Sequence, residues 1–301
     1  MELNDQEKVK YKEILCETMK AFIAFCENNG LRYYASGGTC LGAIRHKGII
    51  PWDDDIDVLM PRKDYNKFLD LKNSLKGSSF EIVEPSDNGY YLPFAKFVNT
   101  NTTIYEVQEH PFIFGIFIDV FPLDDVGDIE IAKNLAKEKN KAWYTYASNL
   151  VSFVPSMFFD FILHFKIKEA LYYLKNSFLG KFFRVKMYRK FLEVEQIIQK
   201  QSGDKWMFYG GVYGVEKELC DKDWFGDGVS VPFETFSIIV PQNYEAYLRH
   251  LFNDYMTPPP VEQRLSHHDQ YFVDLYRRWS LKEIAALKLG KQKKYEKYKY
   301  E

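Results

Sequence analysis

Apolar residues recur at helical spacing through the first thirty positions of the chain, which predicts an amphipathic helix. They are Ile14, Leu15, Phe22, Phe25 and Cys26. Asn4 followed three residues later by Glu7 is the pattern of a capping box, in which each side chain binds the backbone N–H group of the other residue. Gly30 stands where such a helix ends.

Short runs of β-branched and aromatic residues come next, and they predict strands. The expected strands are residues 31–36, 55–60, 80–85, 91–98, 102–107 and 112–121. Gly37 and Gly38 predict a turn after the first strand, followed by a short helix over residues 39–45. Residues 62–75 follow Pro61 and carry a helical pattern.

The second half of the chain has a different pattern. Charged and apolar residues are mixed at helical spacing from about 128 to 203, and the chain then becomes loop-rich and aromatic, with one more helix expected over 244–255. The tail, 291–301, is expected to be solvated. The pattern predicts an α+β fold, in which a mixed sheet with flanking helices carries a helical insertion. We expect a catalytic core over 1–127, the insertion over 128–203 and a completing part over 204–301.

Composition narrows the function classes. The 301 residues are 46% hydrophobic, which is enough for a sizeable core and argues against disorder. The 40 basic and 42 acidic residues give a formal net charge of −2, so nothing draws the whole protein to nucleic acid. The four cysteines are widely spaced, which disfavours zinc or a disulfide framework, and the polar N-terminus lacks a signal-peptide pattern. We therefore expect a cytoplasmic protein.

Four aspartates fall within five residues at 53–57. On a strand, Asp55 and Asp57 would point to one face while Ile56 and Val58 enter the core. Two carboxylates on one face suit a divalent cation such as Mg²⁺ or Mn²⁺ held together with substrate phosphates. Asp53 and Asp54 are interpreted as capping or positioning the strand. The alternative is a solvated acidic loop.

Asp119 stands inside an apolar run, where an unpaired charge costs several kcal/mol, roughly, so it needs a partner or a metal. If its strand lies beside that of Asp55 and Asp57, three carboxylates converge. Lys96 is likewise a single charge in an apolar strand. It predicts a partner, either an acid of the cluster or a phosphate; the alternative is a lysine on a sheet edge.

The two glycines come before a helix whose N-terminus favours a phosphate. Ser36 and Thr39 add hydroxyl donors, and Arg45 and Lys47 add positive charge. The alternative for the two glycines is that they only form a turn. The alternative for the basic stretch around His46 is an exposed polar loop without a ligand.

The stretch 36–69, "SGGTCLGAIRHKGIIPWDDDIDVLMPRKDYNKFL", closely resembles the signature of the LicD family within the nucleotidyltransferase-fold superfamily. "FIDVFPLDD" and "NDYMTPPPVEQRLSHH" are also similar to that family. The resemblance is strong over about 30–125 and patchy over 205–268. Cys40 stands where we expect an aliphatic residue, which we interpret as a packing swap.

The resemblance implies roles for these residues. Gly37 and Gly38 would hold the donor phosphates, Asp55 and Asp57 a metal ion, and Asp119 would be the third acid, as a metal ligand or as the base for the acceptor hydroxyl. LicD-like proteins are similar to enzymes that move phosphocholine from CDP-choline to a cell-surface glycan, of teichoic acid or lipopolysaccharide type, releasing CMP. Other relatives are associated with different sugar-phosphate or polyol-phosphate donors.

Two other functions stay open: a nucleotidyltransferase that releases pyrophosphate, and a non-catalytic glycan-binding relative. An aromatic cage for choline is one interpretation of the aromatic residues, and core packing is the other. The aromatic residues considered are Trp52, Trp206, Phe208, Tyr209, Tyr213 and Trp224. His267 and His268, with Arg264, are candidates for substrate contact or for an exposed turn.

The most apolar stretch, residues 150–165, is too short for a membrane span and contains Pro155 and Asp160. We interpret it as a buried or interfacial helix pair. Basic residues follow at Lys166, Lys168, Lys175, Lys181 and Arg184, so contact with the inner face of a membrane is one alternative and a helical core is the other.

Overall fold

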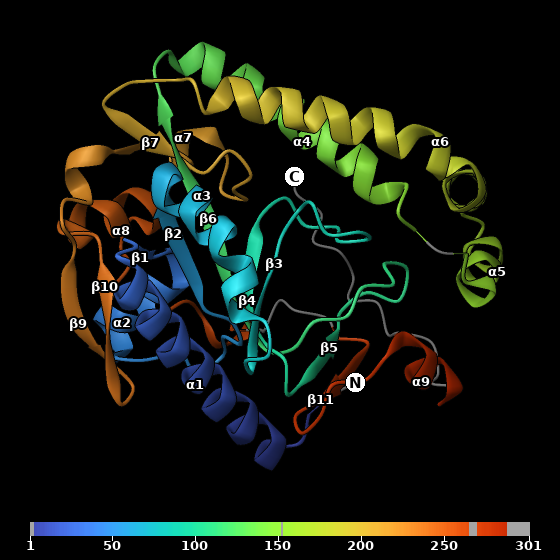
Figure 1. Cartoon of the computed structure of the whole chain (residues 1–301), viewed down its shortest axis with the longest axis horizontal. Coiled ribbons are helices and arrows are strands. Elements are labelled where there is room, and N and C mark those ends of the chain that lie inside the picture. Colours follow the sequence, from blue (N-terminus) through green and yellow to red (C-terminus); the bar gives the residue numbers. More distant parts are fainter. Residues whose placement is uncertain (1–2, 152, 265–269, 288–301) are drawn as a thin grey trace.

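The computed structural model describes residues 3–151, 153–264 and 270–287 (Figure 1). The chain begins with α1, Asp5–Asn29. The side chain of Asn4 accepts a hydrogen bond from the Glu7 N–H group at 3.0 Å, and the Glu7 carboxylate accepts from the Asn4 N–H group at 2.8 Å. Gly30 follows in the left-handed conformation with φ 59°. The predicted capping box and helix end are confirmed.

A mixed sheet of seven strands forms the centre of the molecule, in the order β1-β2-β6-β4-β3, with β7 and β8 continuing from the far half of β6. Its strands are β1 Tyr34–Ala35, β2 Asp57–Pro61, β3 Phe80–Val83, β4 Ala95–Asn99, β6 Phe117–Val126, β7 Lys205–Met207 and β8 Cys220–Asp221. Only β2 and β6 pair in parallel among these described strands. The observed sheet with flanking helices confirms the α+β prediction.

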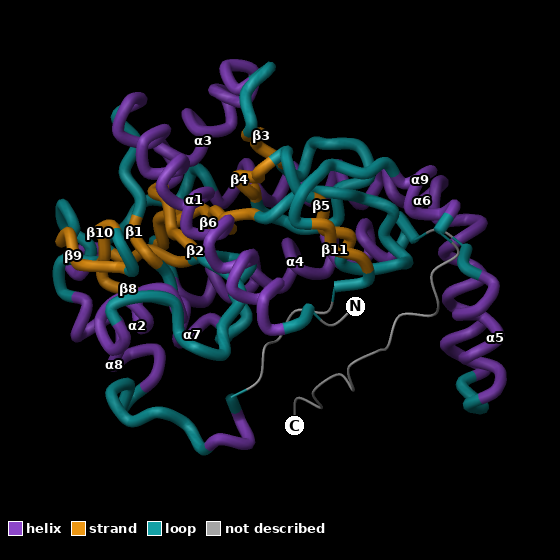
Figure 2. The backbone as a smooth tube through the Cα atoms, turned by 90° about the horizontal axis from the view of Figure 1, so that it is seen from below, coloured by secondary structure: helices purple, strands orange, loops and turns teal. Residues whose placement is uncertain are grey.

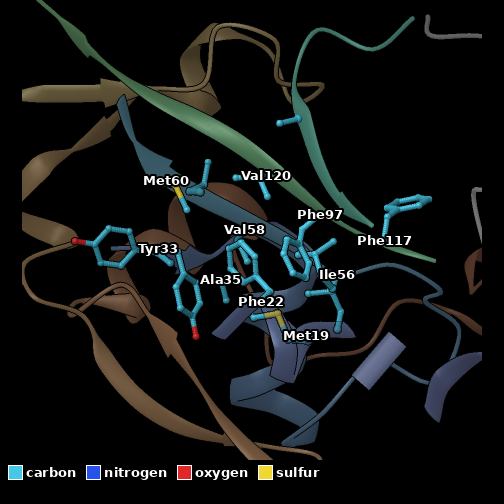
Figure 3. Packing of buried hydrophobic residues seen from close by; sticks show 14 of the residues in the cluster. Met19, Phe22, Tyr33, Ala35, Ile56, Val58, Met60, Phe97, Phe117 and Val120 are labelled. Atoms are coloured by element: carbon cyan, nitrogen blue, oxygen red, sulfur yellow. The ribbon is translucent and has the colours of Figure 1, made fainter. Parts of the chain in front are cut away.

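One face of this sheet packs on α1 to form the main core (Figure 3). Ile56 and Val58 are both fully buried there, as their alternation with Asp57 predicts. Phe22 of α1 lies edge-on to Phe97 of β4, with ring centroids 5.7 Å apart. Because alternate side chains point to opposite faces, this packing leaves Asp57 on the other face of the sheet.

Two helices, α2 Gly37–His46 and α8 Tyr244–Phe252, lie on that second face (Figure 2). Two smaller sheets flank the central one: β9 Val229–Phe233 with β10 Phe236–Val240, and β5 Thr103–Tyr105 with β11 Phe272–Asp274. The remaining short helices are α3 Arg62–Asp70, η1 Leu71–Leu75, α7 Val215–Glu218, η2 Lys222–Trp224, η3 Val261–Gln263 and α9 Leu281–Ala286.

A lobe of three helices is inserted between β6 and β7: α4 Ile129–Ser148, α5 Pro155–Leu163 and α6 Ile167–Ile198. The long helices α4 and α6 run side by side, and α5 lies at their far end (Figures 1 and 2). Arg62 binds Asp124 of β6 through two hydrogen bonds of 2.6 Å and Glu195 of α6 at 3.2 Å, and Lys139 of α4 also binds Glu195. This buried ion network joins the lobe to the sheet.

Some predicted elements differ from the structure. The strand expected over 55–60 begins at Asp57, because pairing with β6 starts there, so Asp55 lies in the preceding loop. The stretch 229–240, expected to be loop, forms the antiparallel hairpin β9–β10. Glu234 lies in the turn between the two strands and adopts φ 50°. The helix pair expected over 150–165 is the single helix α5.

The remaining expectations concern the domain boundaries, the C-terminal tail and contact with a membrane. The division at 127 and 203 stays a prediction. The tail 291–301 lies outside the described residues. No helix in the described part of the chain is long and apolar enough to cross a membrane.

Candidate active site

The N-terminus of α2 is joined to the start of β2. Gly37 begins the helix at φ 40°, a conformation that favours glycine, so the helix starts two residues earlier than predicted. The Ser36 N–H group donates to the Asp57 carbonyl at 2.9 Å, and the Asp57 N–H group donates to the Thr39 hydroxyl at 2.9 Å. These two bonds bring the predicted phosphate-binding turn directly beside the predicted acids.

Asp53, Asp54 and Asp55 form a half-buried loop before β2. One carboxylate oxygen from each lies within 4.8 Å of the others, a spacing that can hold a metal ion. Asp53 Oδ2 lies 3.0 Å from the position that a Cβ atom on Gly38 would take. Gly38 therefore allows the acidic loop to approach the helix N-terminus closely. Asp53 and Asp54 are thus part of the acidic cluster itself, in addition to any role in positioning the strand.

Asp57, Asp119 and Lys96 form a row across three neighbouring strands. Asp57 is the partner of Asp119 in the parallel pair β2–β6, and Asp119 is the partner of Lys96 in the antiparallel pair β6–β4. Directly opposed residues share a face of the sheet. The strands of Asp57 and Asp119 are therefore neighbours, which is the condition under which the carboxylates are expected to converge.

Lys96 is 1% exposed and binds Asp119, with Nζ 2.6 Å from Oδ1. The ammonium group also lies 3.3 Å from the centre of the Phe117 ring. β4 lies between β6 and β3, so the alternative of an edge lysine is wrong and the prediction of an acidic partner is confirmed. A contact between Lys96 and a phosphate stays a prediction.

Several groups shift the pKa of the Asp119 carboxyl, and they act in opposite directions. Burial raises the pKa of its carboxyl to about 6, Lys96 acts to lower it, and the nearby charge of Asp55 raises it further. Asp55 in the loop therefore lies within electrostatic reach of Asp119 in the row. The pKa of Tyr213 is likewise raised, by burial first and then by the charges of Asp57, Glu218, Asp53 and Asp55. The site is a convergence of carboxylates.

Two tyrosines from late in the chain complete the turn, and the sequence pattern did not identify their role. Tyr247 of α8 accepts a hydrogen bond from the Gly37 N–H group at 3.1 Å. The Tyr213 hydroxyl lies 3.5 Å from the position of a Cβ on Gly37. In the sequence, Tyr213 is only one of six aromatic candidates, and no local signal links position 37 to residues 176 and 210 positions away.

Arg45 and Lys47 lie at the opposite end of α2, about 12 Å along the helix axis from Gly37 at 1.5 Å per residue. Arg45 donates to the Tyr255 carbonyl at 2.8 Å and to His46 Nε2 at 2.9 Å. Lys47 is exposed and adopts φ 57° as the helix C-cap. The structure does not bring these two together with the glycine turn, and their contact with donor phosphates stays a prediction.

A second basic group lies near the acidic loop. The Arg264 guanidinium lies 4.9 Å from the ring centre of Trp52, and His46 lies edge-on to the same ring at 5.9 Å. Burial and the charges of Arg45 and Arg264 lower the pKa of His46. Trp52 directly precedes Asp53, so positive and negative groups lie on adjacent parts of one loop.

The other aromatic candidates contact groups other than Asp53, Asp54, Asp55, Asp57 and Asp119. Phe208 stacks on Phe121 with centroids 4.6 Å apart, and Trp206 donates to Asp125 at 2.8 Å. Tyr209 lies in the core of the helical lobe, and Trp224 lies against His250. For these four the core interpretation is favoured. His267 and His268 lie outside the described residues. Cys40 is fully buried, which fits a packing role.

The donor set fits a hard divalent cation. Carboxylates gathered this closely repel one another, and Mg²⁺ is typically held by one or two carboxylates together with substrate phosphates. Three of the acids can converge on one ion at Asp53–Asp55, and Asp57 and Asp119 form a pair on the adjoining strands. The N-terminus of α2 lies beside both sets and favours an anion. The arrangement can therefore bind a metal and a phosphorylated ligand together.

Comparisons with known proteins agree with this chemistry. Residues 30–162 match the family model described as LicD/FKTN/FKRP, nucleotidyltransferase domain. The chain is 28% identical over 276 residues to the lipopolysaccharide cholinephosphotransferase LicD of Haemophilus influenzae, a match covering 87% of this chain and 96% of that protein. It is 39% identical over 64 residues to the ribitol 5-phosphate transferase FKRP of Homo sapiens, covering 21% and 13%. An uncharacterized protein of Rickettsia prowazekii is 37% identical over 68 residues, covering 21% and 26%.

Proposed function

Because the chain belongs, through residues 30–162, to the LicD/FKTN/FKRP nucleotidyltransferase domain family, we propose that it transfers a phospho-alcohol from a nucleotide-linked donor to a hydroxyl group. The finer proposal is transfer of phosphocholine from CDP-choline to a cell-surface glycan, of teichoic acid or lipopolysaccharide type. The similarity along 96% of the Haemophilus influenzae LicD supports it. The observation that carries the chemistry is the row of Asp57, Asp119 and Lys96 beside the N-terminus of α2.

The reaction makes one bond and breaks one. The acceptor oxygen bonds to the phosphorus that carries choline, the bond from that phosphorus to the bridging oxygen breaks, and CMP leaves with the bridging oxygen. Mg²⁺ or Mn²⁺, when bound, neutralises the diphosphate and the departing CMP. Asp55 and Asp57 would hold the cation with Asp119 as the third acid.

The protein's own groups orient the donor. The first turn of α2 offers the amides of Gly38 and Thr39 and the positive end of the helix dipole to the phosphates. Tyr247 holds the Gly37 amide and so fixes the position of the turn. Ser36 and Thr39 add hydroxyl groups at the same place. Lys96 keeps Asp119 oriented and adds positive charge behind it.

We assign Asp119 to the metal rather than to proton transfer. One of its oxygens accepts a hydrogen bond from Lys96, and Asp57 lies beside it on β2. Burial raises the pKa of the Asp119 carboxyl to about 6 in the protein alone, but a divalent cation beside it would favour the charged form and make it a weaker base. The acceptor proton would then leave to solvent or to another acid of the cluster.

The test follows CMP release by purified protein supplied with Mg²⁺, CDP-choline and a cell-envelope glycan. Asp57→Asn is expected to remove the activity, and Asp70→Asn, at an exposed position on the far end of α3, is expected to retain it. CDP-ribitol in place of CDP-choline tests which alcohol the donor carries, since the similar protein FKRP is a ribitol 5-phosphate transferase. Full CMP release by Asp57→Asn would overturn the site assignment.

A second candidate is a nucleotidyltransferase, favoured by the description of the matched domain. CTP supplied with phosphocholine would then release pyrophosphate, whereas the proposed transferase would not. A non-catalytic glycan-binding relative is disfavoured, because all the acids of the site are present. Protein that binds the glycan but releases neither CMP nor pyrophosphate would favour that alternative.

A further inference from the structure

The far end of the helical lobe carries large apolar side chains that are exposed to solvent. On α5 and the turn after it, Phe159, Leu163 and Phe165 are 61%, 71% and 90% exposed. Phe165 adopts φ 55°, an uncommon conformation for a bulky residue, and this turn joins α5 to α6. Single exposed apolar residues are ordinary, but a group of aromatic residues at one end of a helical lobe marks an interaction surface.

The exposed apolar surface continues along α6 as one stripe. Its members recur at intervals of four, seven, four and three residues, which places them within about 60° of one another at 100° per residue. They are Ile167, Leu171, Phe178, Phe182 and Val185, and all are exposed. Tyr172, Leu179 and Phe183 form a second exposed stripe beside the first.

Basic side chains lie between the two apolar stripes. Lys168, Lys175 and Lys186 occupy helical positions between them and are exposed. Lys175 Nζ lies 5.7 Å from the centre of the Phe183 ring. The sequence 164–190 contains eight residues of Lys or Arg and a single acidic residue, Glu169. The basic ones are Lys166, Lys168, Lys175, Lys181, Arg184, Lys186, Arg189 and Lys190.

The opposite face of α6 is already used for folding. Ala170, Tyr173 and Asn176 are buried, and Phe191 packs against Trp143 of α4 with ring centroids 4.5 Å apart. A Cβ on Gly180 would lie 2.7 Å from the carbonyl oxygen of Asn149, so the backbones approach closely there. The exposed stripes are therefore on the outer face of a packed helix.

We propose that this outer face of α5 and α6 docks on an anionic lipid bilayer. Aromatic and aliphatic side chains enter the interfacial region of a bilayer, and lysines between them reach anionic head groups with their charge while their stems cover apolar surface. Protein interfaces, by contrast, are depleted in lysine, which disfavours a second copy or a protein partner. The interleaving of Lys168, Lys175 and Lys186 with apolar stripes is the feature that selects lipid.

The docking face is separate from the candidate active site. α5 lies at one end of the molecule and α2 at the other in both views (Figures 1 and 2). A protein bound through α5 and α6 therefore keeps the acidic site away from the contact. Variants of the docking face alter no residue assigned to the active site, so their effects are distinguishable from failure of the proposed transferase.

Flotation of the full chain with vesicles tests the proposal. Vesicles of phosphatidylcholine with about one third phosphatidylglycerol are expected to carry the protein, and pure phosphatidylcholine vesicles are expected to carry at least tenfold less. Raising the salt concentration is expected to weaken the binding, because charges near the surface are screened. Equal binding to both vesicles, or none to either, would overturn the proposal without any variant.

Matched variants locate the contact. Leu171→Gln/Phe178→Gln/Phe182→Gln removes one stripe and is expected to lower partitioning at least tenfold. Val9→Gln/Ile131→Gln/Tyr276→Gln changes three exposed apolar residues elsewhere and is expected to leave it unchanged. Lys168→Glu/Lys175→Glu/Lys186→Glu tests charge against Lys76→Glu/Lys137→Glu/Lys200→Glu, three exposed lysines outside the face.

Two further measurements on each variant distinguish docking on a bilayer from association with a second copy. Circular dichroism checks that each variant is folded, and sedimentation velocity measures its oligomeric state. Loss of vesicle binding in the stripe and charge variants, with both controls retaining it, supports docking through α5 and α6. Self-association that the stripe variant abolishes, with no vesicle binding by the parent protein, would identify the occupant as a second copy and overturn the proposal.

Discussion

The ammonium group of Lys96 lies 2.6 Å from a carboxylate oxygen of Asp119 in the interior of the sheet. The two residues are direct partners on the antiparallel strands β4 and β6, and Asp57 is the partner of Asp119 on the other side. The pair therefore joins the structural core to the acids of the candidate active site.

Lys96→Met is expected to destabilise the protein by about 3–5 kcal/mol, because it leaves Asp119 as a buried charge without its cation. Urea denaturation followed by circular dichroism measures the change. Lys96→Met/Asp119→Leu removes both charges and is expected to lose much less than the sum of the two single variants. Additive losses would mean that the two groups act independently.

Metal titration separates the two carboxylate sets. Asp57→Asn is expected to weaken Mn²⁺ binding, measured by electron paramagnetic resonance, by at least about tenfold. Asp53→Asn/Asp54→Asn is expected to have a smaller effect if the cation is held by Asp55, Asp57 and Asp119. The reverse order would assign the ion to the Asp53–Asp55 loop, whose carboxylates lie within 4.8 Å of one another.

The ion network of Arg62 is expected to hold the helical lobe on the sheet. Arg62→Met leaves Asp124, which is 1% exposed, without its bidentate partner and is expected to cost about 3–5 kcal/mol. Hydrogen exchange is expected to rise in α4 and α6, since Glu195 loses the same partner. Lys133→Met, which removes two ion pairs with the exposed carboxylates of Glu130 and Glu216, serves as the control and is expected to leave the unfolding midpoint unchanged. Unaltered exchange in α6 would contradict the proposed anchoring.

His110 is expected to make stability depend on pH. Burial lowers its pKa from 6.5 to about 4 in the folded protein, where it stacks on Tyr91 with ring centroids 4.6 Å apart. The unfolded chain therefore binds the proton first, and the stabilisation present above about pH 6.5 is lost as the pH falls toward 4.

The difference between the parent protein and His110→Phe isolates this effect, because phenylalanine keeps the stacking and removes the titration. Asp119, whose pKa is raised to about 6, contributes in the opposite direction in both proteins. Urea denaturation gives the unfolding midpoints of the parent protein and the variant at pH 7.5 and at pH 5. The difference between the two midpoints is expected to shrink or to change sign at pH 5, because only the parent protein loses stability through His110. A constant difference would show that His110 does not titrate in this range.

The sequence by itself determined the local features. The capping box of α1, the presence of a short helix next to the paired glycines, the burial of Ile56 and Val58, and the acids at 53–57 all follow from residues within a few positions of one another. Such features depend on hydrogen bonds and side-chain periodicity inside a short segment, so a pattern can express them.

Only the tertiary structure decided which distant groups meet. The register that sets Asp119 opposite Asp57, the Tyr247 hydroxyl on Gly37, and the shift of Asp55 from strand to loop each depend on pairing between segments 62 or more positions apart, or on where that pairing begins. A residue on a strand can face many partners, and the choice is made by packing of the whole sheet on α1. The exposed stripes of α6 were likewise decided by which face α4 covers, because a pattern apolar on several sides does not say which side is buried.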